Sequence, residues 1–153
     1  PGNEPAGLSV PPCRRFSEDG QSVDLSPLIG LKGSGLEALR QDILGVYGVG
    51  PETADSILLY ALDGESFVID AYTLRIFERH GILRPDTPYE QAKLVFEGIL
   101  GRDLDLFNEY HAQIVALGKT FCKTRNPLCD QCPLGEDRCF VAVQRGTVSG
   151  PRP

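Results

Sequence analysis

A short turn with two glycines, Gly48-Val49-Gly50, constrains the fold of this sequence more than any other feature. Apolar residues at helical spacing precede it, and Pro51 opens a second apolar stretch directly behind it. Glycine allows a sharp turn close to a ligand, and proline suits the first turn of a helix. The pattern predicts two helices joined by a tight hairpin, with free backbone amides at the start of the second helix. Such amides bind anions, a DNA phosphate being the obvious one, although most turns of this kind only connect helices.

Helical spacing continues beyond the hairpin, and no strand-length alternation competes with it. Thr87, Pro88 and Glu90 match a capping box with proline at the first helical position. Residues 1–34 are rich in Gly, Pro and Ser and are expected to be irregular. The predicted class is all-α, with helices at about 36–45, 51–62, 71–80, 88–100 and 103–121.

Length and charge limit the kind of protein this can be. With 153 residues, 41% of them hydrophobic, the chain can bury one ordinary core. The net charge of −6 argues against a protein that coats nucleic acid in general. Residues 1–110 carry nine Lys and Arg against eighteen Asp and Glu, whereas residues 111–153 carry six against three, so a polyanion should favour the C-terminal end. No apolar run approaches the ~18 residues that cross a bilayer, and no signal peptide opens the chain, so we expect an intracellular protein without a membrane partner.

Four of the five cysteines lie close together, at Cys122, Cys129, Cys132 and Cys139. An intracellular setting argues against disulfides, and both zinc and a [4Fe-4S] cluster accept four thiolates. Structural zinc sites commonly use two short cysteine pairs, but here only Cys129 and Cys132 form one, and six residues separate each outer cysteine from it. The spacing favours an iron-sulfur cluster and leaves zinc as the alternative. Cys13, far from the others, is interpreted as a bystander.

Three segments together resemble the helix-hairpin-helix DNA glycosylases of the endonuclease III superfamily. "GVYGVGPETADSILLYAL" matches the hairpin, "FVIDAYTLRIFERHG" the segment with the catalytic aspartate, and the four-cysteine loop the cluster at the C-terminal end. The resemblance covers about residues 36–140 and is nearest to the branch with the endonuclease III-like 3-methyladenine DNA glycosylases. Between the irregular segment at 1–34 and a tail at 140–153, it implies a partial six-helix barrel with the hairpin at 35–121 and an iron-sulfur loop at 122–139.

The resemblance places the catalytic carboxylate at Asp70. A carboxylate near the sugar stabilises the positive charge that builds up when the N-glycosidic bond breaks, and it can orient water. Asp70 also precedes a predicted helix, so it can serve as an N-cap, and both roles can hold. In bifunctional members a lysine that forms a Schiff base follows the hairpin, but this sequence has Glu52 there. We therefore expect a monofunctional glycosylase, with Glu52 acting at least as a favourable charge in the first helical turn.

The expected partner is double-stranded DNA with a damaged base, bound by a monomer in the cytoplasm on the nucleoid. An alkylated purine carries positive charge, leaves readily and suits an aromatic pocket, for which Tyr72 and Lys119 are the candidates. Lys123 and Arg125, between the first two cysteines, are expected to contact phosphates. The candidate DNA-binding set is Gly48, Val49, Gly50, Glu52, Thr53, Lys123 and Arg125.

Residues 1–34 do not resemble the helices that precede the hairpin in the family and close its barrel. The spacing from Cys132 to Cys139 is also one residue longer than the common pattern. Two alternatives therefore stay open: a DNA-binding module without catalysis, or a glycosylase for mismatched adenine or oxidised pyrimidines. The sequence does not identify the excised base.

Overall fold

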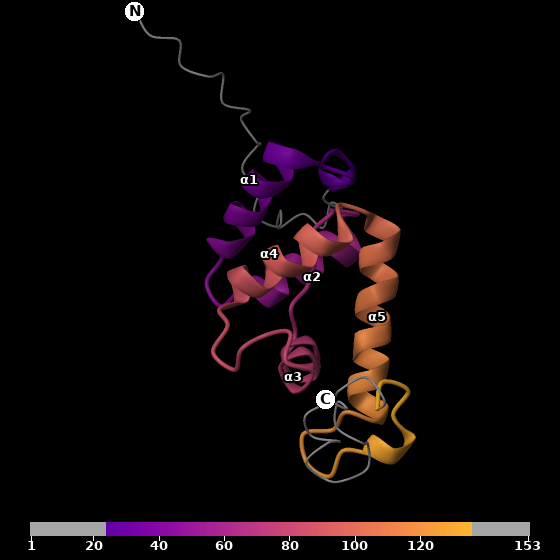
Figure 1. Cartoon of the computed structure of the whole chain (residues 1–153). Coiled ribbons are helices and arrows are strands. Elements are labelled where there is room, and N and C mark those ends of the chain that lie inside the picture. The colour runs from indigo at the N-terminus through magenta and orange to yellow at the C-terminus, as the bar shows by residue number, and fades with distance from the viewer. Residues whose placement is uncertain (1–23, 136–153) are drawn as a thin grey trace, which may run out of the picture.

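The computed structural model describes residues 24–135, and within this range it contains helices and no strand (Figure 1). The prediction of an all-α fold is therefore confirmed for this part of the chain. The elements are a 3-10 helix at Ser26–Leu28, α1 at Gly33–Leu44, α2 at Pro51–Ala61, α3 at Ala71–Arg79, α4 at Tyr89–Leu100, α5 at Leu104–Thr120 and a 3-10 helix at Cys129–Gln131.

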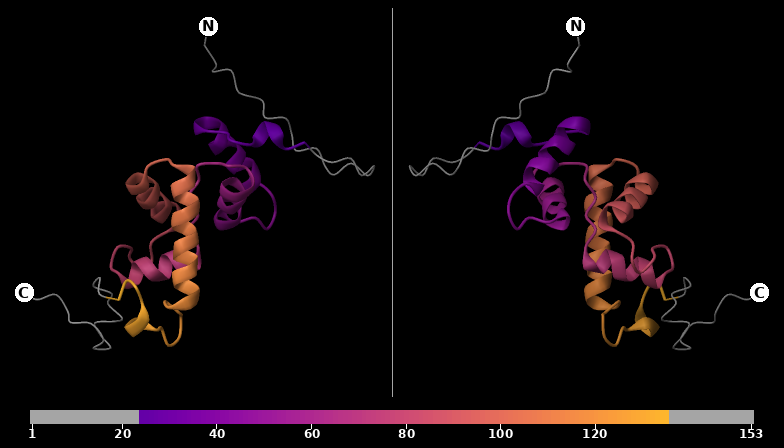
Figure 2. Two further views of the ribbon diagram at one scale, coloured as in Figure 1. Left: turned by 90° about the vertical axis from the view of Figure 1, so that its right-hand side faces the viewer. Right: turned by 90° about the vertical axis from the view of Figure 1, so that its left-hand side faces the viewer.

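The pair formed by α1 and α2 lies at one end of the molecule and the cysteine-rich loop lies at the other (Figure 2). The longest helix, α5, leads to the loop and packs against both α3 and α2. None of the helices in residues 24–135 is long and apolar enough to cross a membrane.

Two predicted helix starts need correction. The first helix begins at Gly33, inside the segment that was expected to be irregular. The predicted capping box at Thr87 is wrong, because α4 has Pro88 as its N-cap, without a side-chain cap. Thr87 Oγ1 instead accepts from the amide of Arg84 at 3.0 Å and donates to its carbonyl at 2.8 Å, which closes the preceding turn. Glu90 accepts a hydrogen bond from Arg40 at 2.7 Å.

Two groups of buried apolar residues form the core. The smaller joins α1 to α2 through Leu36, Leu39, Leu58 and Leu62. The larger centres on Phe67, in the segment between α2 and α3, whose ring stacks on Phe96 at 5.0 Å and meets Phe107 edge-on at 5.3 Å. The apolar stretch behind Pro51 forms α2, but only part of it faces the core: Leu58 and Leu59 are buried, whereas Ile57 and Ala61 are exposed.

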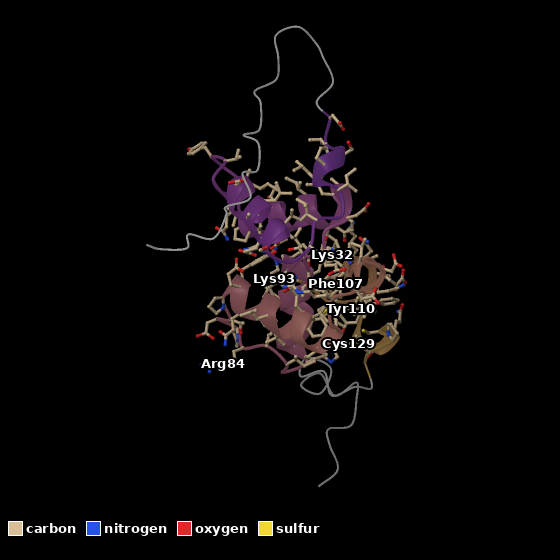
Figure 3. The ribbon with its side chains drawn as sticks, turned by 90° about the horizontal axis from the view of Figure 1, so that it is seen from above. Lys32, Arg84, Lys93, Phe107, Tyr110 and Cys129 are labelled. Atoms are coloured by element: carbon tan, nitrogen blue, oxygen red, sulfur yellow. The ribbon has the colours of Figure 1, made fainter. Side chains whose placement is uncertain are left out.

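A fully buried carboxylate, Asp55, ties four parts of the fold together. Its oxygens accept two hydrogen bonds from Arg40 of α1, at 2.7 and 2.9 Å. One of them also accepts a hydrogen bond from Lys93 of α4 at 2.6 Å. The Lys93 side chain lies between α4 and the α1–α2 pair (Figure 3). Ser66 and Tyr89 complete the network at 2.6 and 2.8 Å. A buried carboxylate is tolerated only when it is paired and hydrogen-bonded, as here.

The network also fixes the charge of Asp55. Burial acts to raise the pKa of this carboxyl, but the hydrogen bonds and charges of Arg40 and Lys93 outweigh it, so the pKa lies below its ordinary value of 3.8. A carboxyl whose pKa is lower in the folded state contributes stability above its unfolded pKa. That contribution is lost as the pH falls through the folded pKa, so the fold is expected to weaken in acid below about pH 4.

Replacing Asp55 with alanine leaves Arg40 and Lys93 buried without their carboxylate. We expect a loss of about 3–5 kcal/mol in the free energy of unfolding, measured by chemical denaturation. The matched control is Glu90→Ala, which also removes an acceptor of Arg40. The Glu90 side chain is 58% exposed, so this variant should lower the free energy of unfolding by less than about 1 kcal/mol. Equal losses in the two variants would contradict the central role of Asp55.

Candidate active site

Asp70 is the N-cap of α3, as one of the two sequence interpretations predicted. Its Oδ1 accepts hydrogen bonds from the amide of Thr73 at 2.7 Å and from the Thr73 hydroxyl at 2.8 Å. Within residues 24–135, no donor bonds to Oδ2. The Asp70 side chain is 11% exposed, so one oxygen is anchored in a largely buried position and the other is left for a different partner.

A histidine that the sequence analysis did not select lies next to this second oxygen. His111, in the middle of α5, is 6% exposed, and its Nε2 lies 3.5 Å from Oδ2 of Asp70. Its Nδ1 is hydrogen-bonded to the hydroxyl of Tyr60, near the end of α2. The three side chains therefore form a chain of contacts from α2 through α5 to the start of α3.

The surroundings keep Asp70 negatively charged. Burial acts to raise the pKa of this carboxyl, but the adjacent His111 ring and the two hydrogen bonds from Thr73 outweigh it, so the pKa lies below its ordinary value. The carboxylate also sits at the N-terminus of a helix, where negative charge is favoured. Asp70 can therefore stabilise a positive charge that develops beside it.

The hairpin presents free amides, as the glycine pattern predicted. Gly48 has a φ of 86°, a conformation that favours glycine, and Gly50 is the N-cap of α2. Within the described part of the chain, the backbone N–H groups of Gly50, Glu52 and Thr53 donate no hydrogen bond. The first acceptor of α2 is the carbonyl of Gly50, which bonds to Ala54 at 3.0 Å. The exposed N-terminus of α2 can therefore bind an anion.

Asp70 and the hairpin are separate but connected. Tyr60 follows Pro51 by nine positions on α2, which corresponds to about 14 Å along a helix. Since Tyr60 bonds to His111 beside Asp70, the carboxylate lies near the far end of α2. The hairpin can therefore hold a phosphate some distance away from a nucleotide at Asp70.

A positively charged groove of about 460 Å³ begins directly after Asp70. It brings together the two pocket candidates, Tyr72 and Lys119, and also Lys123. The Tyr72 ring packs on Gly118 of α5, where any added Cβ would lie 2.3 Å from the ring, and the Arg75 guanidinium lies 5.1 Å from the ring centroid. The groove therefore has a fixed aromatic wall and several side-chain cations.

Two arginines of α3 hold the start of the cysteine loop. Arg75 donates to the carbonyl of Cys122 at 2.8 Å. Arg79 donates to Cys122 Sγ at 3.1 Å and to the carbonyl of Lys123 at 2.9 Å. Lys123 and Arg125, the predicted phosphate contacts, are both exposed on this loop.

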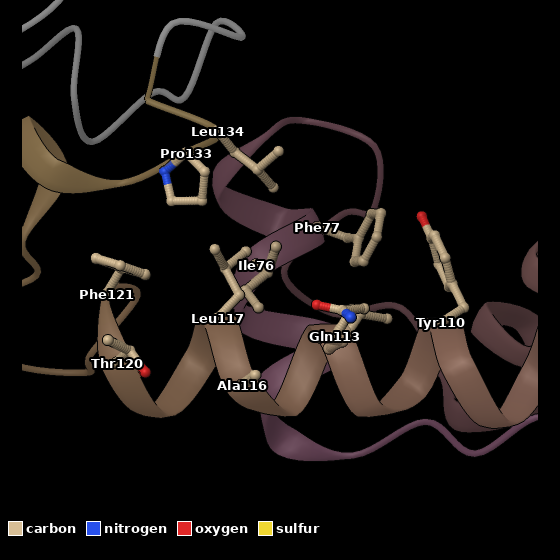
Figure 4. A pocket seen from close by; sticks show the side chains of 11 residues that line it. Ile76, Phe77, Tyr110, Gln113, Ala116, Leu117, Thr120, Phe121, Pro133 and Leu134 are labelled. Atoms are coloured by element: carbon tan, nitrogen blue, oxygen red, sulfur yellow. The ribbon is translucent and has the colours of Figure 1, made fainter.

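The later part of the loop folds back over the helices. Pro133 and Leu134 face Ile76 of α3 and Leu117 of α5 across an apolar groove of about 380 Å³ (Figure 4). Gly135 lies so close to the Cys129 carbonyl that an added Cβ would be 2.7 Å away. Cys13 and Cys139 lie outside the described residues. Within residues 24–135, no three Cys, His, Asp or Glu side chains lie close enough together to hold a metal ion.

Comparison with known proteins agrees with this arrangement. No family model matches the chain. A Methanocaldococcus jannaschii protein named as a DNA repair glycosylase is 53% identical over 98 residues, which are 64% of this chain and 44% of that protein. Endonuclease III of Sulfolobus acidocaldarius is 32% identical over 103 residues, 67% of this chain and 45% of that protein. The chain belongs to the endonuclease III-like superfamily of helix-hairpin-helix DNA glycosylases.

More distant members of the superfamily differ in their named activities. The thymine-DNA glycosylase of Aeropyrum pernix is 27% identical over 109 residues, which are 68% of this chain and 48% of that protein. The chain thus spans about half the length of the relatives it matches.

Proposed function

We propose that this chain carries the catalytic carboxylate of a DNA glycosylase that acts in base excision repair. The observation that carries the proposal is the state of Asp70, whose Oδ1 is anchored by Thr73 while Oδ2 has no donor among the described residues. The family membership and the cationic groove lined by Ala71 and Tyr72, which follow Asp70 in the sequence, support it further. Cytoplasmic, nucleoid-associated action as a monomer is part of the proposal.

The proposed reaction is hydrolysis of the N-glycosidic bond of a nucleotide flipped out of duplex DNA. As the base leaves with the bonding electrons, positive charge builds up on the deoxyribose, and Asp70 stabilises that charge through Oδ2. Water then adds to the sugar and loses a proton, which leaves an abasic site. Because the Thr73 hydrogen bonds and the helix N-terminus hold Asp70 as a carboxylate, its charge is in place before the bond breaks.

The enzyme is proposed to be monofunctional. Glu52 occupies the position where bifunctional relatives carry the Schiff-base lysine, and a carboxylate cannot form an imine. Glu52 is exposed in the first turn of α2, where its charge is favourable for the helix. Its role in DNA binding would be to lie beside the amides of Gly50 and Thr53 that take the phosphate.

An alkylated base is the proposed substrate, and two features bear on it. The Tyr72 ring already accommodates a cation, Arg75, so its face can also attract a positively charged purine. Lys119 and Lys123, however, favour phosphate or an uncharged base in the same groove. The thymine-DNA glycosylase among the relatives makes a mismatched thymine the second candidate. A panel with alkylated purines, oxidised pyrimidines, mismatched adenine and mismatched thymine separates these substrates.

The cysteine loop is proposed to hold a [4Fe-4S] cluster through Cys122, Cys129, Cys132 and Cys139. The donor set fits the group, because four thiolates are its usual ligands, and Arg79 donates a hydrogen bond to the sulfur of Cys122. When bound, the cluster would fix the shape of the loop. Lys123 and Arg125 would then contact DNA phosphates at the end of the molecule opposite to α1 and α2.

Replacing Asp70 with asparagine tests the central residue. Asparagine is also a good N-cap, so the variant should fold. Its rate of free-base release from lesion-bearing duplex should fall at least ~100-fold, because the negative charge is lost. The matched control is Asp103→Asn at the N-cap of α5, where Asp103 accepts from Leu106 at 2.9 Å, and it should keep full activity. Borohydride should trap no covalent adduct with the unsubstituted protein. Full activity of Asp70→Asn would refute the proposal, and DNA binding without base release from any lesion would instead support a binding module.

Replacing Lys123 and Arg125 together with alanine tests the phosphate contacts. Affinity should fall equally for damaged and undamaged duplex, and the slope of log affinity against log salt should decrease by about two. Arg84→Ala, which removes an exposed arginine between α3 and α4, serves as the control. An effect restricted to one lesion would show that the pair reads bases.

Metal analysis tests the cysteine loop. Anaerobically purified protein should contain about four iron and four sulfide per chain and absorb visible light. Cys122→Ser should lose iron, whereas Cys13→Ser should retain it. Stoichiometric zinc in place of iron would contradict the cluster and support the zinc alternative.

A further inference from the structure

The pair formed by His111 and Tyr60 has no role in the function described so far. His111 is nine-tenths buried, yet its Nε2 makes no hydrogen bond within residues 24–135. Leaving a buried polar atom unpaired costs free energy, so such an atom calls for a specific explanation. Oδ2 of Asp70 lies 3.5 Å from this nitrogen, and no donor in the described range bonds to that oxygen. The unsatisfied Nε2 therefore lies beside the oxygen of Asp70 that Thr73 leaves free.

The other ring nitrogen, Nδ1, contacts the hydroxyl of Tyr60. Burial and the negative charge of Asp70 raise the pKa of the Tyr60 hydroxyl, so this group keeps its proton and can donate it to Nδ1 of His111. In a neutral imidazole only one nitrogen carries a proton, and the partner of one nitrogen decides which. A carboxylate oxygen can only accept, so pairing of Nε2 with Oδ2 of Asp70 assigns the ring proton to Nε2 and leaves Nδ1 to accept from Tyr60.

The packing keeps the histidine in this orientation. Its ring stands perpendicular to Phe67, with centroids 6.2 Å apart, and lies 5.9 Å from the Tyr60 ring. Since His111 follows Phe107 and precedes Ile114 on the buried face of α5, the helix itself points the ring toward Asp70. A shortening of about 0.5 Å would bring Nε2 and Oδ2 to hydrogen-bond distance.

We propose that Tyr60 and His111 are positioning residues for Asp70: the Tyr60 hydroxyl selects the Nε2-protonated form of His111, and that N–H orients Oδ2 toward the sugar. The inference rests on the proposed function of Asp70. Thr73 holds Oδ1, and an N–H at Nε2 of His111, 3.5 Å from Oδ2, would restrain the second oxygen of the carboxylate.

The first test measures the histidine directly in the full-length protein by ¹⁵N NMR of the imidazole nitrogens. The chain has two histidines, so a His80→Gln variant assigns the signals of His111. We expect the Nε2-protonated tautomer in the unsubstituted protein and a loss of this preference in Tyr60→Phe. Tyr110→Phe is the matched control. Tyr110 directly precedes His111 on α5, and its hydroxyl makes no hydrogen bond in the described range. A proton on Nδ1 in the unsubstituted protein would overturn the inference.

The second test measures base release at saturating duplex. His111→Phe should lower the rate about 10–100-fold and Tyr60→Phe by a smaller factor, with DNA affinity unchanged, as is typical for the loss of an orienting partner. His111→Asn, which restores an N–H donor, should recover part of the rate. If Asp70→Asn is inactive while His111→Phe and Tyr60→Phe keep the full rate, the inference is wrong but the proposed function of Asp70 stands. If Asp70→Asn is itself fully active, the proposed function fails and the inference fails with it.

Discussion

The buried charge of Asp55 is the constraint on which the arrangement of this fold depends. One carboxylate with no exposed surface takes hydrogen bonds from α1, α4 and the segment before α3. A buried charge is far more costly when a partner is missing, so the network fixes the helices in one relative position. Because Asp55 lies in the first half of α2, it sets the direction of the helix that carries the hairpin at one end and Tyr60 at the other.

This fixed α2 gives the candidate site its geometry. The hairpin amides and Tyr60 are separated by about 14 Å of a single rigid helix, and Tyr60 leads through His111 to Asp70. A phosphate bound at the hairpin is therefore at a set distance from the carboxylate. At the other end, Arg75 and Arg79 tie the cysteine loop to α3, the helix that Asp70 caps. Asp70 is thus coupled through packed elements to both regions that are proposed to hold DNA.

Sequence patterns predicted the helices and the cap at Asp70, because apolar spacing and cap residues are local signals. The same patterns did not predict the buried polar contacts between helices. Asp55 sits within an apolar stripe, but only the packing of α1 and α4 shows that Arg40 and Lys93 reach it. His111 was likewise visible in "YHAQIVALGKTFC", yet its partners are 51 and 41 positions away along the chain. The capping box at Thr87 failed because the Arg84 backbone competed for the threonine hydroxyl.

The most direct measurement is a crystal structure of the full-length protein bound to duplex DNA in which a pyrrolidine replaces the sugar of the target nucleotide. The ring nitrogen carries the positive charge that the sugar acquires during base loss. The account predicts this nitrogen about 3 Å from Oδ2 of Asp70, with Oδ1 still bonded to Thr73 and a phosphate on the amides of Gly50 and Thr53. A nitrogen paired with a different carboxylate, with Asp70 still enclosed between His111 and Thr73, would contradict it.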